Sequence, residues 1–185
     1  MPVKVITPPA PVVSLDEAKQ HLIVDYPDDD LLIETYIQAA TAWLDGPTGW
    51  LGQVLGEQVL EIVSEHDPLC LPSLLQPVTD IVQVSFTDEH GVEQIVDPET
   101  YQLGGDKLWL WPLSPLRHAT NSRIRFKAGY PVVNGKSTVP PPIRVAILML
   151  VGHWYQNRSA VVIGNAVADV PITVEALLSP YRVYR

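Results

Sequence analysis

The sequence has few of the residues from which catalytic and redox sites are built. Cys70 is its single cysteine, so no disulfide can form within the chain. Because Cys70 lies in the apolar run 69–71, we expect it to pack rather than to act as a nucleophile. No G-x-S-x-G elbow and no G-x-x-x-x-G-K-S/T or G-x-G-x-x-G loop is present, although these motifs mark serine nucleophiles and phosphate sites. We therefore predict no catalytic residue, no cofactor and no enzymatic activity.

Metal ligands at suitable spacings are also missing from the sequence. Asp28, Asp29 and Asp30 are consecutive, and consecutive side chains diverge around a helix axis, so they cannot all face one cation. We expect these carboxylates to cap the free amides at the start of a helix. His153 has no second His or Glu at a ligand spacing, which favours a satisfied or interface histidine over a ligand or a base. No metal site is predicted.

Positive charge is scarce and unevenly placed. The chain has 12 Lys and Arg against 21 Asp and Glu, a net charge of −9, which disfavours nonspecific binding to a phosphate backbone. Residues 1–100 carry 2 basic and 18 acidic residues, whereas residues 101–185 carry 10 basic and 3 acidic ones. The two parts can attract each other between copies, in a head-to-tail contact that closes a ring, or they can pair within one monomer. The sequence leaves both open.

An uninterrupted hydrophobic segment of membrane-spanning length is missing. Pro8, Pro9 and Pro11 interrupt the N-terminal stretch, where a secretory signal needs a continuous apolar core, so we expect residues 1–13 to form an extended arm. The most apolar later stretch, 143–155, contains Arg144 and is too short to cross about 30 Å of hydrocarbon. We predict no membrane contact.

What the sequence does have is a composition that is 46% hydrophobic over 185 residues, enough to bury a core, together with four helix signals. Ser14-Leu15-Asp16-Glu17 has the spacing of a capping box and predicts a short helix. Turn and cap signals predict three more helices, from Asp28 to Gly46-Pro47, from Pro142 to Asn157, and from Val174 to Leu178. The periodicity predicts an inward stripe on each long helix: Leu32, Tyr36, Ala39, Ala40 and Trp43, then Ile143, Ile147, Leu150, Val151 and Trp154.

Residues 53–127 change to a period of two, which is typical of strands. Val82, Val84 and Phe86 are predicted to share one face, and residues 88–91 to form a turn. Further strands are expected at 92–96, 101–103, 108–111 and 122–128. In the last of these, apolar residues alternate with a basic row that is a candidate contact surface: Arg123, Arg125 and Lys127. Trp109 and Trp111 share a face, where they either stack on a ligand or pack against a helix.

These elements predict an α+β protein, a small α-helical bundle of about four helices with a β-rich insertion between the second and third helices. The expected organisation is an extended arm at 1–13 and a helical half at 14–52, followed by a β insertion at 53–130. The long central helix and a loop occupy 131–172, and a C-terminal helix and tail occupy 173–185.

The stretch 123–158, RIRFKAGYPVVNGKSTVPPPIRVAILMLVGHWYQNR, resembles the signature region of the gp6-like head-tail connector family of long-tailed phages and prophages, also called adaptor or head-completion proteins. In that family a strand ending in A-G-Y leads to V-P-x-x-I/L and then to a helix ending in H-W-Y-x-N-R. The segments S-L-D-E-A-K-x-H-L near the N-terminus and 174–182 near the C-terminus resemble it as well.

The resemblance implies a structural role at the neck of a virion, with assembly in the host cytoplasm. Such proteins form a ring, commonly dodecameric, beneath the portal protein. The ring extends a channel that DNA crosses without specific binding, and it docks a stopper or tail-completion protein. By the same resemblance the residues expected to dock to the portal are Leu177, Leu178, Tyr181, Arg182, Tyr184 and Arg185. The expected subunit interface comprises Asp28, Asp29, Asp30, Glu34, Arg144, Leu148, His153, Tyr155 and Arg158.

Other interpretations stay open at this point. Arg144 and Arg158 can bind carboxylates of a neighbouring copy or carboxylates of their own chain. The β insertion, with Trp109 and Trp111, could serve a small ligand- or carbohydrate-binding module. A hydrolase built from unmarked carboxylates is a third alternative, since spacing in the sequence does not report spacing in the fold.

Overall fold

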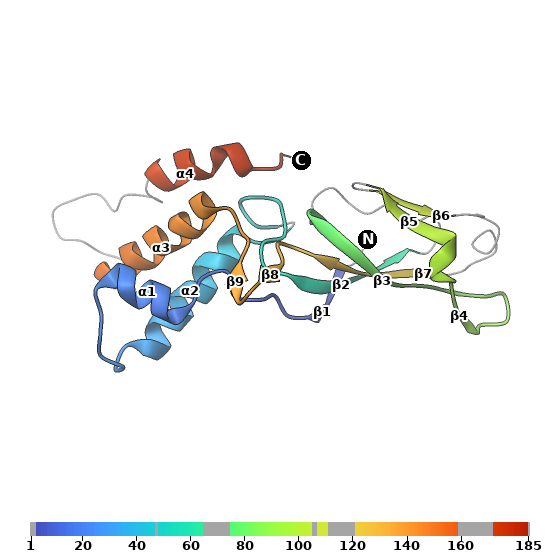
Figure 1. The fold of residues 1–185 in the computed structure, drawn as a ribbon, viewed down its shortest axis with the longest axis horizontal. Coiled ribbons are helices and arrows are strands. Elements are labelled where there is room, and N and C mark those ends of the chain that lie inside the picture. The colour runs from blue at the N-terminus through green and yellow to red at the C-terminus, as the bar shows by residue number, and fades with distance from the viewer. Residues whose placement is uncertain are drawn as a thin grey trace. The chain divides into compact units, whose positions relative to one another are not determined.

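The computed structural model describes residues 3–46, 48–64, 75–104, 107–110, 121–158 and 172–184, without the side chains of 64, 104, 107–110 and 172 (Figure 1). The chain forms two compact units. We call Met1–Ala10 with Gln53–Tyr130 the sheet unit, and Pro11–Gly52 with Pro131–Arg185 the helical unit. The predicted α+β fold, with a β insertion between the second and third helices, is confirmed.

The sheet unit is built on five antiparallel strands in the order β1-β2-β7-β3-β4. They are β1 (Val3–Thr7), β2 (Gln58–Ser64), β3 (Val78–Thr87), β4 (Glu93–Ile95) and β7 (Asn121–Ala128). A one-turn 3-10 helix, Pro98–Thr100, precedes a separate hairpin of β5 (Tyr101–Gly104) and β6 (Lys107–Leu110). Val3–Thr7, within the segment predicted as an arm, therefore form an edge strand, which pairs with β2.

The central strand β7 shows most clearly why this sequence forms a sheet. Its alternate residues Ser122, Ile124, Phe126 and Ala128 are buried, and the residues between them are half-buried. Ile124 and Phe126 lie in a core with residues of β2 and β3, and the side chains of Tyr101 and Leu103 from β5 pack against that core. The strand thus carries one apolar face and one charged face, as its period of two predicts.

The face predicted for β3 is wrong at one position. Val84 is buried and Phe86 is half-buried, but Val82 is 47% exposed. The register between β3 and β7 shifts between Ile81 and Gln83. An extra residue in one strand moves the residues on either side of it out of simple alternation, so Val82 does not join the apolar face.

Gly129, in the A-G-Y segment, occupies a position that no other residue type can take without a steric clash. Its φ is 94°, and an added Cβ would collide with the backbone carbonyl of Gly56. At this crossing the Gly129 N–H donates to the Pro77 carbonyl (2.8 Å) and the Tyr130 N–H donates to the Leu55 carbonyl (2.8 Å). The glycine therefore allows two backbone segments to approach closely at the end of β7.

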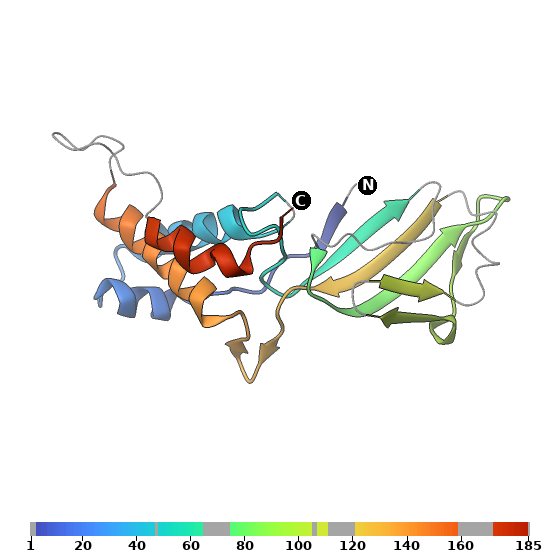
Figure 2. The same cartoon turned by 90° about the horizontal axis from the view of Figure 1, so that it is seen from above.

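The helical unit contains α1 (Leu15–Leu22), α2 (Asp30–Leu44), α3 (Pro141–Gln156) and α4 (Ile172–Leu178) (Figure 2). A small hairpin of β8 (Val132–Val133) and β9 (Lys136–Ser137) precedes α3. The α3 helix packs against each of the other three helices. None of the helices in the described part of the chain is both long and apolar enough to cross a bilayer.

The capping box that opens α1 is confirmed. The Glu17 N–H donates to the Ser14 hydroxyl oxygen (3.2 Å), and the Ser14 N–H donates to the Glu17 carboxylate (3.0 Å). The predicted inward stripe of α2 is displaced by one residue. Of the predicted stripe only Ala40 is buried. The other buried residues of α2 are Ile33, Ile37 and Leu44. Two parallel apolar rows run along α2, and the packing against α3 selects one of them.

Candidate functional site

The C-terminal segment holds the residues predicted to dock to the portal. Leu178 is fully buried, as is Val174, because α4 packs against α3. Beyond α4 the chain forms a one-turn 3-10 helix, Ser179–Tyr181. Leu177 and Tyr181 are half-buried, whereas Arg182 and Tyr184 are exposed; Arg185 lies outside the described residues. Leu178 thus anchors the segment from inside, whereas Arg182 and Tyr184 lie on its outer surface.

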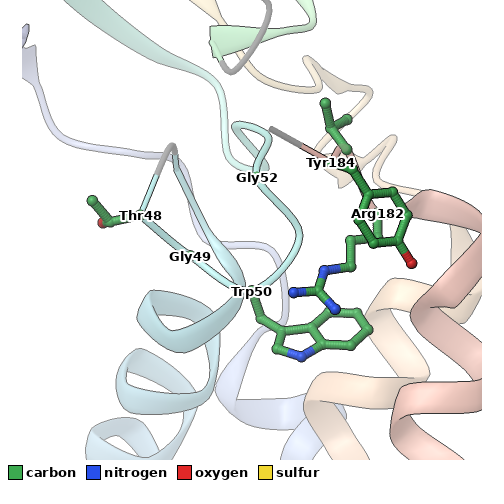
Figure 3. A pocket seen from close by; sticks show the side chains of 7 residues that line it. Thr48, Gly49, Trp50, Gly52, Arg182 and Tyr184 are labelled. Atoms are coloured by element: carbon green, nitrogen blue, oxygen red, sulfur yellow. The ribbon is translucent and has the colours of Figure 1, made fainter.

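The end of this segment is held on the loop that follows α2 (Figure 3). The Val183 N–H donates to the Leu51 carbonyl at 2.8 Å. The Arg182 guanidinium lies 4.4 Å from the centroid of the Trp50 ring, and the Trp50 ring stacks on Trp43 with 6.1 Å between centroids. A cation above an aromatic face is attracted by the ring quadrupole. Arg182 therefore links the C-terminal segment to the loop after α2 through a cation–π contact.

A hollow of about 380 Å³ opens beside this contact. Its walls are formed by Thr48, Gly49, Trp50, Gly52, Arg182, Val183 and Tyr184. Its walls present aromatic rings and one cation, and these residues bring together no set of acids, bases or nucleophiles. The hollow therefore suits contact with another protein better than catalysis. Sequence analysis missed Trp50. The sequence feature that could have indicated Trp50 is its place between glycines in a loop. A tryptophan there is not explained by packing in the core of a helix or a strand.

At the acidic start of α2, Asp30 lies in the first turn as expected, but the predicted capping bond from the Asp29 side chain is absent. Asp29 occupies the cap position without a side-chain hydrogen bond to the helix. Its carboxylate instead accepts hydrogen bonds from the Tyr155 hydroxyl and from Arg158 Nη2 (2.9 Å) at the end of α3. These bonds hold the pKa of Asp29 below its usual value, the Tyr155 bond contributing most, and the same bond raises the pKa of Tyr155. The carboxylate joins two helices.

The neighbouring charges of this cluster are arranged around the same loop. Lys19 Nζ of α1 lies 2.6 Å from Asp30 Oδ1 and donates to the Tyr26 carbonyl at 2.9 Å. The Tyr26 hydroxyl lies 3.1 Å from the hydroxyl of Tyr155. Of the other residues predicted for a subunit interface, Asp28 and Glu34 are exposed, and Leu148 and His153 are half-buried on α3.

Arg144 also binds a carboxylate of its own chain. Its guanidinium pairs with Glu17, the residue that closes the capping box of α1. Burial acts to raise the pKa of Glu17, but the Ser14 backbone N–H and Arg144 outweigh it, so the pKa of Glu17 is lowered. Both Arg144 and Arg158 thus have a carboxylate partner within their own chain, and their place in a subunit interface stays a prediction.

The basic row of β7 is paired across the sheet in the same way. Arg125 Nε lies 2.6 Å from Glu61 Oε2 on β2, and Glu61 is buried. The other two pairs are longer and more exposed, Arg123 with Glu93 at 3.4 Å and Lys127 with Asp80 at 3.8 Å. Basic residues from the C-terminal part of the chain thus meet acidic residues from the N-terminal part within one monomer. Whether the row also forms a contact surface stays a prediction.

The remaining sequence predictions concern sites of chemistry. In the described part of the chain, no group of three His, Cys, Asp or Glu side chains could hold a metal ion. Cys70 and Trp111 lie outside the described residues, and so does the side chain of Trp109. The ligand-binding alternative that rests on the two tryptophans therefore stays a prediction.

Solved structures that are similar to this chain include chains of gene transfer agent (GTA) particles. A chain of the "Neck of empty GTA particle computed with C6 symmetry" is 19% identical with a TM-score of 0.74. A chain of the "Virion of native gene transfer agent (GTA) particle" is 20% identical with a TM-score of 0.74. A chain of the "Neck of native GTA particle computed with C12 symmetry" is 18% identical with a TM-score of 0.70. Each alignment covers 100% of this chain and 97% of the other.

None of the curated proteins matches the chain. The sequence model of one protein family, described as "Phage gp6-like head-tail connector protein", matches residues 12–94 and 115–182. These ranges include all four helices of the helical unit and strands β2, β3 and β7 of the sheet unit. The chain therefore belongs to the phage gp6-like head-tail connector family, a family of structural proteins rather than enzymes.

Proposed function

We propose that the protein is a subunit of a ring at the neck of a tailed-phage or gene-transfer-agent particle, where it joins the portal of the head to the tail. The observation that carries this proposal is the family match over both units of the chain. The whole fold is also shared with proteins from particle necks that were resolved with C6 and C12 symmetry. A ring of identical subunits has such symmetry, and by resemblance to the family we expect twelve copies.

The ring extends the DNA channel of the portal without holding DNA. The chain has a net charge of −9, and like charge disfavours lasting contact between a channel wall and phosphates. Most of the basic residues predicted for contacts have carboxylate partners in their own chain. This pairing removes the basic patches that would otherwise slow the passage of DNA.

The portal docks on the C-terminal segment. Leu177, Tyr181, Arg182, Tyr184 and Arg185 are the proposed contacts, and Leu178 holds the segment in place from the core. Aromatic and arginine side chains on a firmly packed element are typical of residues that dominate binding energy. The opposite face of the ring would receive a stopper or tail-completion protein.

Native mass spectrometry of the full-length protein, alone and with purified portal, tests this function. We expect a ring of about twelve copies to form on the portal, the number that the resemblance to the family implies. A chain that stays monomeric and never binds the portal would refute the proposal. Portal binding should also weaken in Arg182→Glu and remain in Lys4→Glu, a matched charge reversal on the exposed edge strand β1. Circular dichroism of both variants shows whether the fold is kept.

A further inference from the structure

Ile23 is in an unfavourable conformation that the subunit alone does not explain. It ends α1 with φ 57° and ψ 47°, in the left-handed region, and its side chain is 93% exposed. Glycine or asparagine normally takes this position, because a β-branched side chain clashes with its own backbone there. An isoleucine at this position therefore adds backbone strain and exposes apolar surface, with no compensating burial within the monomer. Such strain often marks a site that works in contact with something else.

The surface around Ile23 combines this exposed apolar side chain with two carboxylates. Ile23 and Val24 line a shallow hollow of about 690 Å³ together with Asp16, Lys19, Gln20 and Asp25. Asp16 and Asp25 are exposed, and neither forms an ion pair with another described residue. The ammonium group of Lys19 is already paired with Asp30. A partner that fits this hollow would offer apolar side chains beside a positive charge.

The β8–β9 hairpin of the same protein offers these groups. Asn134 and Gly135 form its turn with positive φ values of 51° and 73°, as a tight two-residue hairpin requires. Val132 and Val133 are 44% and 52% exposed. Lys136 is exposed and makes no ion pair with any residue in the described ranges. The hairpin is therefore an apolar and basic projection, complementary in character to the surface at Ile23.

The two surfaces lie too far apart to meet within one subunit. Lys136 and Ser137 line a hollow with Ser14 and Glu17 at the start of α1, whereas Ile23 ends that helix. The eight residues of α1 span about 12 Å. In both views the connection from α1 to α2 lies at the end of the helical unit opposite the hairpin (Figures 1 and 2). Two different, complementary surfaces on opposite ends are what a head-to-tail contact between identical subunits needs to close a ring.

We infer that the β8–β9 hairpin of one copy packs on Ile23 of the next copy, with Val132 and Val133 against the isoleucine and Lys136 near Asp16 and Asp25. This inference rests on the proposed function, since it names the contact that holds the ring together.

The first test compares Ile23→Gly and Ile23→Asn with wild type for ring formation on purified portal, measured by native mass spectrometry. Both replacements accept a positive φ and remove the apolar side chain. We expect the yield of rings to fall about ten-fold or more, as the loss of one buried aliphatic side chain per contact predicts. The melting temperature of the monomer should stay the same or rise. Ile95→Asn is the matched control, because Ile95 is 68% exposed on β4 of the sheet unit.

The second test locates the contact by disulfide trapping in a Cys70→Ser background. Ile23→Cys and Val133→Cys placed in one chain should give covalent ladders of subunits on non-reducing gels after assembly on the portal, whereas either single cysteine should give none. A bridge needs Cα atoms within about 7 Å, so a bridge within one chain is not expected, and it would run as a monomer. Dimers from Ile23→Cys alone would indicate a symmetric contact and overturn the inference.

The outcomes separate this inference from the proposed function. If the wild-type protein never forms rings with the portal, the proposed function fails. If wild-type rings form and the Ile23 variants form them equally well, or the double-cysteine protein gives no ladder, the ring function stands and the hairpin contact is wrong.

Discussion

Removing the indole ring of Trp50 tests how the C-terminal segment is held on the helical unit. Trp50→Ala loses the stacking on Trp43 at 6.1 Å and the Arg182 cation 4.4 Å above the ring. An aromatic pair contributes about 0.5–1.5 kcal/mol and a cation at an exposed ring about 0.5–1 kcal/mol. We therefore expect the free energy of unfolding to fall by about 1–2.5 kcal/mol from these two contacts, measured by urea denaturation followed by far-ultraviolet circular dichroism.

A double-mutant cycle isolates the part of this effect that belongs to the C-terminal segment. Trp50→Ala and Arg182→Ala should show a coupling energy of about 0.5–1 kcal/mol, because each single variant removes the same contact. Trp50→Ala with Arg158→Ala is the control and should be additive, since Arg158 contacts Tyr155 and Asp29 instead. A coupling below about 0.3 kcal/mol between Trp50 and Arg182 would show that the ring does not hold the segment and would refute the reasoning.

Three further predictions concern stability. In the folded chain the pKa of Asp29 and that of Glu17 lie below their ordinary values of 3.8 and 4.5. The stabilisation from both carboxylates is therefore present above the ordinary values and is lost as the pH falls through the lowered pKa values of the folded chain; urea midpoints should drop as the pH falls below about 5, and less in Asp29→Asn. Arg144→Ala should lower the free energy of unfolding by about 1 kcal/mol, while Arg144→Lys keeps part of it; equal stability of all three proteins would contradict the Glu17 pair. Ile23→Gly should raise that free energy by up to about 1 kcal/mol, and a clear fall in melting temperature would argue against strain at Ile23.

Local signals in the sequence were sufficient where the interacting residues are close neighbours. The capping box of Ser14 and Glu17 involves residues three positions apart, so its spacing alone specifies the hydrogen bonds. The alternation along β7 follows from the pleat of a strand, which needs no knowledge of the partner strands. The number of helices and the place of the β insertion followed from the same short-range patterns.

Packing decided the cases in which the sequence offered two equal choices. On α2, Leu32 and Tyr36 form one apolar row, and Ile33 and Ile37 form another one position further on. Periodicity cannot choose between adjacent rows, because both have helical spacing. On β3, the bulge that exposes Val82 depends on the register with β7, which is set by residues far away in the sequence.

The sequence by itself determined the family, the α+β class and the acidic-to-basic polarity of the chain, because these are properties of composition and of short motifs. Only the tertiary structure decided which charges meet. Asp29 and Arg158 are 129 positions apart, and the helices must pack before their attraction can act. The same holds for Arg182 over Trp50 and for the exposed, left-handed Ile23. Long-range contacts and solvent exposure are properties of the packed chain, and they distinguish the residues that hold one subunit together from those available to the next.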